Sequence, residues 1–249
     1  MSRVASMRVD HDHHVHSTFS DDAHSTPEDN LAAALRRGLA SIRMTDHVRG
    51  DTTYVPEFLA AVAALRPPEG LEVLTGVEAK LLDTSGAVDA PPEVLRSLGT
   101  RSGPGRVLLA DHQLPGPDGP WSPRVARERL ASGLEPVAAV QQLIDAYAGA
   151  LRHTGPAQLA HPFSILPKIG LSEEHITEDQ LDELAAAVLA ADAVVEVNEK
   201  WRCPGARIRA RLDRHGVAMV ASSDAHHADD VGRYQWLALE AEGGTRSTS

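Results

Sequence analysis

The sequence predicts an α/β fold in which seven parallel strands form a closed or nearly closed barrel. Stretches typical of buried strands alternate with helical stretches along almost the whole chain, which is the pattern of βαβ units in a parallel sheet. The chain has 249 residues, a length at which an α/β barrel forms one domain. No linker or internal repeat interrupts the alternation, so we expect one domain over 1–249, with its core at about 8–240 and disordered termini.

The first part of the chain begins with a strand that runs from Arg8 to His16 and enters a polar loop. The segment Ser25–Asp29 then provides an N-cap, a proline in the first turn and early acidic residues, and Gly38 ends the helix that follows. Further elements of both kinds come next. They are a strand at 41–46, a helix at 56–65, a strand at 71–78 and a weak helical pattern at 91–98.

The second part of the chain continues the alternation. Strands are expected at 105–111, 157–160, 193–197 and 217–222, and helices at 135–151, 178–191 and 207–215. Residues 115–123 are rich in proline and glycine, which predicts a long loop, and the tail from Gly243 is expected to be disordered. In barrels of this kind the functional residues lie at the C-terminal ends of the strands.

Composition narrows the class of partner. The formal net charge is −11, with 35 acidic residues against 24 Lys and Arg, whereas proteins that bind duplex nucleic acid normally carry a basic face. We therefore expect no extended nucleic acid as partner, although a small basic pocket could still bind a phosphate monoester. Aromatic residues make up only 4% of the chain, so Ala, Val and Leu must build most of the core.

Cysteine content and the longest apolar runs indicate the compartment. Cys203 is the only cysteine, which excludes an intramolecular disulfide and a thiolate metal cage. The longest apolar runs are far shorter than a membrane span, and residues 1–7 lack the apolar core of a signal peptide. We therefore expect a cytoplasmic protein with no membrane partner; the sequence does not predict an oligomeric state.

Residues able to bind metals lie at or just after every expected strand end. His14 and His16 are two residues apart at the end of the first strand and therefore point to one face. The later strand ends carry His47, Glu78, His112, His161, Glu196, Asn198, Asp224 and His226. One such residue is weak evidence, but seven consecutive strand ends with these residues indicate a metal site.

The types of ligand indicate the chemistry. Imidazoles and carboxylates without thiolates suit Zn, Mn or Fe, and the sequence does not choose among them. Clustered cations lower the pKa of a bridging water and so generate a hydroxide near neutral pH. They can also hold the oxygens of a phosphoryl group while that hydroxide attacks in line. The pattern therefore predicts a metal-dependent hydrolase.

A set of short motifs, in this order, resembles the polymerase and histidinol phosphatase (PHP) superfamily over residues 8–235. The motifs are Asp12-His13-His14-Val15-His16-Ser17-Thr18-Phe19-Ser20-Asp21-Asp22, Thr45-Asp46-His47, Gly76-Val77-Glu78, His112, Ala160-His161-Pro162, Glu196-Val197-Asn198 and Ser223-Asp224-Ala225-His226. The resemblance implies a distorted (β/α)7 barrel with three divalent metal ions at the C-terminal ends of its strands.

The resemblance also implies a ligand set, and every position in it is filled. The first metal would be bound by His14, His16, Glu78 and Asp224, the second by Asp21 or Asp22 with His47 and His226, and the third by Glu78, His112 and His161. Asp21 and Asp22 are adjacent and either could be the ligand. The spacing from Phe19 resembles the histidinol-phosphatase branch, which favours Asp22.

Catalytic and substrate-binding residues are expected beside these ligands. Asp224 and His226 are candidate catalytic residues, and Lys200 and Arg202, which follow the sixth strand, are candidates for binding phosphate. Trp201, between them, could pack against an organic part of the substrate or simply cover the core.

Other residues could support the site. Arg49 and Lys80 follow expected ligands closely and are further candidates for contacting phosphate. Asp12, Asp46 and Asp111 each lie next to, or close in sequence to, an expected ligand histidine and could accept the second N–H of its ring, which would fix the tautomer.

We expect a phosphoesterase that acts on a small phosphate monoester, with histidinol phosphate as one possible substrate. The phosphate part of this expectation depends on the resemblance, which is an analogy. A nuclease or phosphatase on short oligonucleotides or nucleoside bisphosphates is an alternative, as is a C–N hydrolase, because the same activated water can attack a carbonyl. A non-catalytic metal-binding domain is the alternative outside the enzymes.

Overall fold

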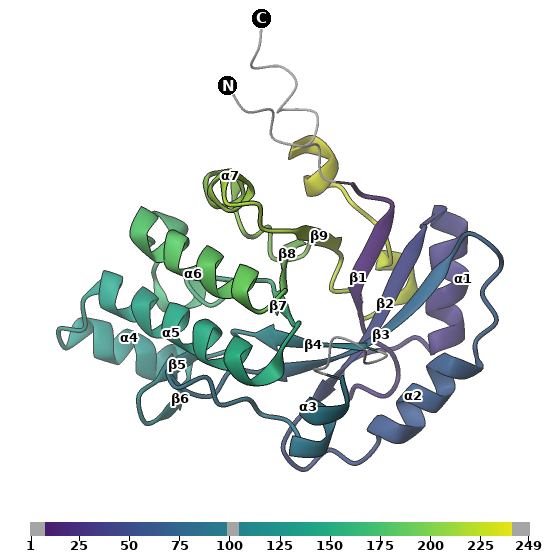
Figure 1. Ribbon diagram of the computed structural model, residues 1–249, viewed down its shortest axis with the longest axis horizontal. Coiled ribbons are helices and arrows are strands. Elements are labelled where there is room, and N and C mark those ends of the chain that lie inside the picture. Colours follow the sequence, from purple (N-terminus) through teal and green to yellow (C-terminus); the bar gives the residue numbers. More distant parts are fainter. Residues whose placement is uncertain (1–7, 99–104, 241–249) are drawn as a thin grey trace, which may run out of the picture.

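Seven parallel strands form the central sheet of the protein (Figure 1). The computed structural model describes residues 8–98 and 105–240, and the strand order is β1-β2-β3-β4-β7-β8-β9 with every neighbouring pair parallel. The strands are β1 (His11–Val15), β2 (Ser41–Val48), β3 (Glu72–Lys80), β4 (Gly105–Ala110), β7 (Gln158–Ala160), β8 (Val194–Asn198) and β9 (Met219–Ser222).

The two edge strands, β1 and β9, come together and nearly close the sheet. Val15 forms an isolated parallel bridge with Ala225, and the backbone N–H of His16 donates to the carbonyl of Ala225 at 2.8 Å. Further down, the imidazole Nε2 of His11 accepts a hydrogen bond from the N–H of Ala221 at 2.9 Å. The sheet is thus an α/β barrel that is almost complete, and the predicted fold class is confirmed.

Helices connect the strands and cover the sheet. They are α1 (Pro27–Arg37), α2 (Val55–Ala64), α3 (Pro92–Leu98), α4 (Pro123–Ala131), α5 (Pro136–Thr154), α6 (Glu178–Ala190) and α7 (Ala206–Arg214), with short 3₁₀ turns η1 (Pro167–Ile169), η2 (Glu173–His175) and η3 (Ala228–Asp230). The predicted start of α1 is confirmed, because the Thr26 side chain accepts from the N–H of Asp29, and Gly38 ends the helix at φ +68°. No helix in the described part of the chain is long and apolar enough to span a membrane.

Strand alternation separates an outer core from the barrel interior. Val107 and Leu109 of β4 pack in the large apolar cluster that includes buried residues of α5 and α6, whereas Leu108 and Ala110 point the other way and contact Ala160. Leu108 is also in register with Glu78 on β3. The candidate ligands therefore lie at the level of a small apolar layer inside the barrel.

The predicted long loop at 115–123 is wrong. Leu114–Gly116 (β5) and Gly119–Trp121 (β6) pair as an antiparallel hairpin, and Gly119 has a φ of +126°, which favours glycine at this turn. Directly afterwards the Ser122 side chain accepts from the N–H of Val125 and caps α4. The weak pattern at 91–98 does form a helix, α3. The expected disordered tail from Gly243 lies outside the described residues.

Candidate metal centre

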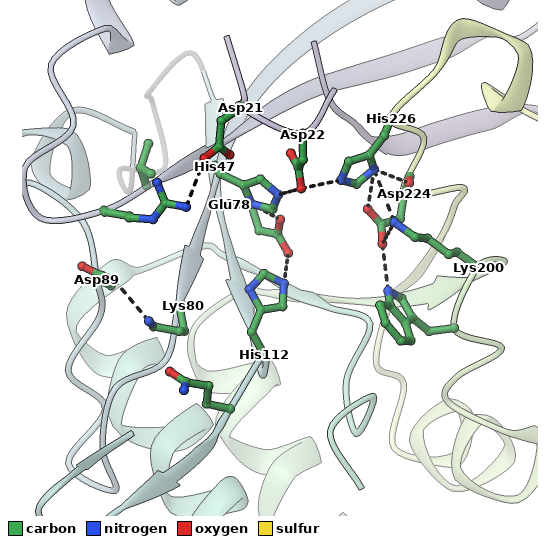
Figure 2. A pocket seen from close by; sticks show the side chains of 14 residues that line it. Asp21, Asp22, His47, Glu78, Lys80, Asp89, His112, Lys200, Asp224 and His226 are labelled. Carbon is green, nitrogen blue, oxygen red and sulfur yellow. Dashed lines mark hydrogen bonds and ion pairs between the residues drawn. The ribbon is translucent and has the colours of Figure 1, made fainter. Parts of the chain in front are cut away.

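The candidate ligands come from the C-terminal ends of the strands, and Figure 2 shows those that line the pocket: Asp22, His47, Glu78, His112, Asp224 and His226. His14, His47 and Glu78 lie near the ends of β1, β2 and β3, and the others directly follow β1, β4, β7 and β9. The candidate ligand atoms form three groups, and the atoms within each group lie within 4.8 Å of one another. The groups are His14, His16 and Asp224; His16, His47 and His226; and Glu78, His112 and His161.

The first group is fully buried. The Nε2 atoms of His14 and His16 are 3.0 Å apart, and Asp224 Oδ1 lies 3.9 Å from the first and 3.4 Å from the second. Two imidazole nitrogens this close must share a proton or a cation, because two N–H groups cannot point at each other.

Glu78 connects the groups through its two oxygens. Oε1 lies 3.2 Å from Nε2 of His112 and 2.9 Å from Nε2 of His161. Oε2 lies 3.4 Å from the Nε2 atoms of both His14 and His16 and 2.8 Å from Nδ1 of His47. Despite these neighbours, Oε2 is buried with no hydrogen-bond partner.

Asp21 and Asp22 point to different places, as Figure 2 shows. Asp22 Oδ2 lies 3.4 Å from Nε2 of His47 and 3.4 Å from Nε2 of His226. Asp21 instead faces the guanidinium of Arg49 at 3.7 Å, with 72% of its side chain exposed. Asp22, rather than Asp21, thus lies beside two histidines of the second group, His47 and His226.

A cavity of about 360 Å³ opens over the cluster. Lys200 lines it, with Nζ 3.3 Å from Asp224 Oδ2 and 3.3 Å from Nδ1 of His226. Arg49 and Lys80 line the cavity too, and Lys80 faces Asp89 at 3.6 Å.

Arg202, which was expected beside Lys200 at the substrate, does not line the cavity. It is exposed and has a φ of +54°, so the chain turns between these two residues and the second side chain leaves the site. Sequence spacing alone cannot reveal such a turn, and we do not retain Arg202 as a substrate-binding residue.

Comparison with known families identifies the chain. The PHP domain family model matches residues 12–200, which hold all the candidate ligands except the two that follow β9. The chain belongs to the PHP domain family. A further model, described as PHP-associated, matches residues 206–241.

Individual relatives of this PHP domain are distant but cover most of it. The "Probable phosphatase TTE1963" of Caldanaerobacter subterraneus subsp. tengcongensis is 26% identical over 239 residues, covering 92% of this chain and 80% of the relative. The histidinol phosphate phosphatase (HisK) of Lactococcus lactis is 16% identical with a TM-score of 0.61, covering 94% of this chain and 90% of the other. The hisK protein of Listeria monocytogenes, also 16% identical, has a TM-score of 0.65 and covers 90% of this chain and 97% of its own. The two structures show the same fold.

The electrostatics of this PHP domain fit a site for divalent cations. Burial disfavours a charged Glu78, but His14 and His112 hold the pKa of its carboxyl well below its usual range. Burial likewise opposes protonation of His161, but Asp111 and Glu78 raise its pKa to about 10. Positive charge beside Glu78 thus favours its ionised form. Metal ions would supply that positive charge, and the unpartnered Oε2 of Glu78 gives them a free ligand atom.

Other buried side chains orient the candidate ligands. The most direct of these contacts, between Glu196 and His14, was not predicted. Glu196 Oε2 accepts from Nδ1 of His14 at 2.9 Å, a bond that fixes which nitrogen of that ring faces the cluster. Gln158 donates to the same oxygen at 2.9 Å. Glu196 was identified at the end of its strand, but nothing in the sequence indicates that its partner would be His14, 182 residues earlier.

The three aspartates expected in this role behave differently. Asp111 Oδ1 lies 3.4 Å from Nδ1 of His161 and accepts from Ser164 at 2.7 Å, so the ring that it supports is that of His161 and not that of its neighbour in sequence, His112. Asp46 instead accepts from the side chains of Ser17 and Ser20, each at 2.6 Å. Asp12 accepts from the N–H groups of Ser223 and Gly232 at 2.9 and 2.8 Å, and from the Ser223 hydroxyl at 2.6 Å. The prediction that Asp12 and Asp46 bind the ring of a ligand histidine is therefore wrong. Both carboxylates instead accept hydrogen bonds from loop residues.

Proposed function

We propose that this chain is a metal-dependent phosphatase that hydrolyses small phosphate monoesters. The observation that carries the proposal is the convergence of buried and partly buried imidazoles and carboxylates into three groups. His16 belongs to two of these groups, and Glu78 of the third lies 3.4 Å from it. Family membership supports the proposal, as do two related proteins. The Caldanaerobacter relative is named a probable phosphatase, and the Lactococcus enzyme is described in complex with zinc, L-histidinol and phosphate.

Nine residues would hold three divalent ions, with Zn, Mn or Fe suited to the ligands. The proposed sets are His14, His16, Glu78 and Asp224; Asp22, His47 and His226; and Glu78, His112 and His161. Bound there, the ions would activate a water as nucleophile and stabilise negative charge on the phosphoryl oxygens.

The chain's own residues prepare the site for this reaction. Glu196 and Asp111 hold the rings of His14 and His161 through their second nitrogens. Lys200, at the rim of the cavity, presents an ammonium group that can bind a phosphoryl oxygen. The cavity of about 360 Å³ suits a small molecule better than a polymer, which favours a small phosphate ester as substrate.

The test combines metal content with turnover. Protein purified without chelator is expected to contain two or three metal ions per chain by elemental analysis and to hydrolyse p-nitrophenyl phosphate. A panel with histidinol phosphate, sugar phosphates and nucleoside bisphosphates then separates the monoesterase from the nucleotide-directed alternative. His14→Ala is expected to abolish turnover, whereas His153→Ala, at an exposed position on α5, serves as control. Protein that binds no metal after addition of Mn²⁺ or Zn²⁺ would refute the proposal.

A further inference from the structure

Trp201 contacts the metal centre in a way that the proposed function does not use. It lies in the turn after β8, and its indole Nε1 donates to Oδ2 of Asp224 at 2.8 Å. Lys200 Nζ lies 3.3 Å from the same oxygen. With Oδ2 held by two donors, Oδ1 is the oxygen that faces His16 and His14.

The indole is itself held in place from more than one side. The Trp201 backbone N–H donates to Oδ1 of Asn198 at 2.8 Å, and Asn198 in turn donates to Glu196, the residue that fixes the ring of His14. The ammonium of Lys168, in η1, lies 4.0 Å from the centroid of the indole ring, a cation–π contact. These contacts hold the indole in place although 37% of Trp201 is exposed.

An aspartate on its own has a soft terminal torsion. Rotation of the Asp224 carboxylate about its last side-chain bond is broad, so without a partner the plane of the carboxylate could turn and neither oxygen would be held toward the histidines. A fixed N–H donor on Oδ2 removes this freedom and leaves a single oxygen directed at His14 and His16. Lys200 alone would hold the carboxylate less firmly, because its ammonium is on a long flexible stem and 46% of its side chain is exposed.

We infer that Trp201 is a positioning residue for the metal centre: its indole N–H orients Asp224 so that one carboxylate oxygen is presented to the ion shared with His14 and His16. The inference rests on the proposed function, in which these residues bind metal. Groups that hydrogen-bond to metal ligands commonly contribute ten- to hundredfold to metal affinity. Trp201→Phe, which keeps an aromatic ring but removes the donor, should therefore weaken one class of metal site by about 10–100-fold.

The experiment is a titration of chelator-treated, dialysed protein with Mn²⁺ by isothermal calorimetry. The matched control is Trp121→Phe, because the half-buried Trp121 indole donates to Asp118 Oδ1, also at 2.8 Å, in the β5–β6 hairpin outside the ligand cluster. Trp201→His, which retains a ring N–H donor, tests the hydrogen bond directly. We expect wild-type affinity in the control, a weakened site in Trp201→Phe and an intermediate affinity in Trp201→His.

The outcomes separate this inference from the proposed function. Wild-type protein that binds Mn²⁺ while Trp201→Phe binds it within twofold of the Trp121→Phe control would overturn the role of Trp201 alone. Equal weakening in Trp201→Phe and Trp201→His would also overturn it, because it would show that ring packing matters and the donor does not. Failure of the wild type to bind metal would overturn the proposed function and this inference with it.

Discussion

Replacing Glu78 by glutamine removes the carboxylate that contacts a member of each of the three ligand groups. Oε1 serves His112 and His161, and Oε2 serves His14, His16 and His47. Glutamine has nearly the same volume, so no cavity is created, but its amide offers one acceptor oxygen in place of two. One side of the centre must therefore lose its ligand atom.

The magnitude follows from the number of ions lost. We expect at least one ion fewer per chain in Glu78→Gln. A bound ion contributes several kcal/mol of transition-state stabilisation, and a loss of about 4 kcal/mol corresponds to roughly a thousandfold decrease in kcat/KM.

Elemental analysis after gel filtration and steady-state kinetics with an aryl phosphate measure both effects. Glu72→Gln, at the exposed first residue of the same strand, is the matched control and should behave as the wild type. A Glu78→Gln protein that keeps wild-type metal content and kcat/KM within tenfold would refute the bridging role.

Three further outcomes are expected. Glu196→Gln should weaken metal binding about 10–100-fold by calorimetry, because the ring of His14 then faces a neutral amide in place of a charged carboxylate; an unchanged affinity would contradict this. Asp22→Asn should lower kcat/KM by at least about 10–100-fold, whereas kcat/KM of Asp21→Asn should remain within about threefold of the wild type. The opposite result would exchange the roles of the two aspartates. Burial raises the pKa of the Cys203 thiol well above its usual value, so it should not react with Ellman's reagent at pH 8 until the protein is unfolded.

Much of the fold was predictable because its signals are local. Apolar runs, the N-cap at Thr26 and the glycine at position 38 each act within a few residues, and the corresponding elements form nearly where expected. The hairpin β5–β6 was missed because proline and glycine normally indicate loops. Helix α4 was missed although Ser122 and Pro123 repeat the serine- or threonine-proline start of α1, so that signal was present in the sequence.

The convergence of the candidate ligands was predictable for a different reason. In a parallel barrel all strand ends meet at one rim, so position along each strand is enough to bring the candidates together. The partners of those ligands depend on side-chain direction across distant strands. The bond between Trp201 and Asp224 joins residues 23 apart, and the left-handed backbone at Arg202 turns one cation away. Neither follows from composition or spacing.

The choice between the two neighbouring aspartates illustrates this dependence. Asp46, on β2 beside His47, accepts from the N–H of Ser17 at 2.8 Å and from the hydroxyl of Ser20 at 2.6 Å, and that hydroxyl accepts from the N–H of His47 at 2.9 Å. Hydrogen bonds to a buried carboxylate are among the stronger ones in proteins, so they fix the loop immediately before Asp22 relative to the end of β2. That fixed loop sets which aspartate faces the histidines. A residue on another strand therefore helps to set which aspartate lies beside His47 and His226, whereas the spacing of the motif alone left both open.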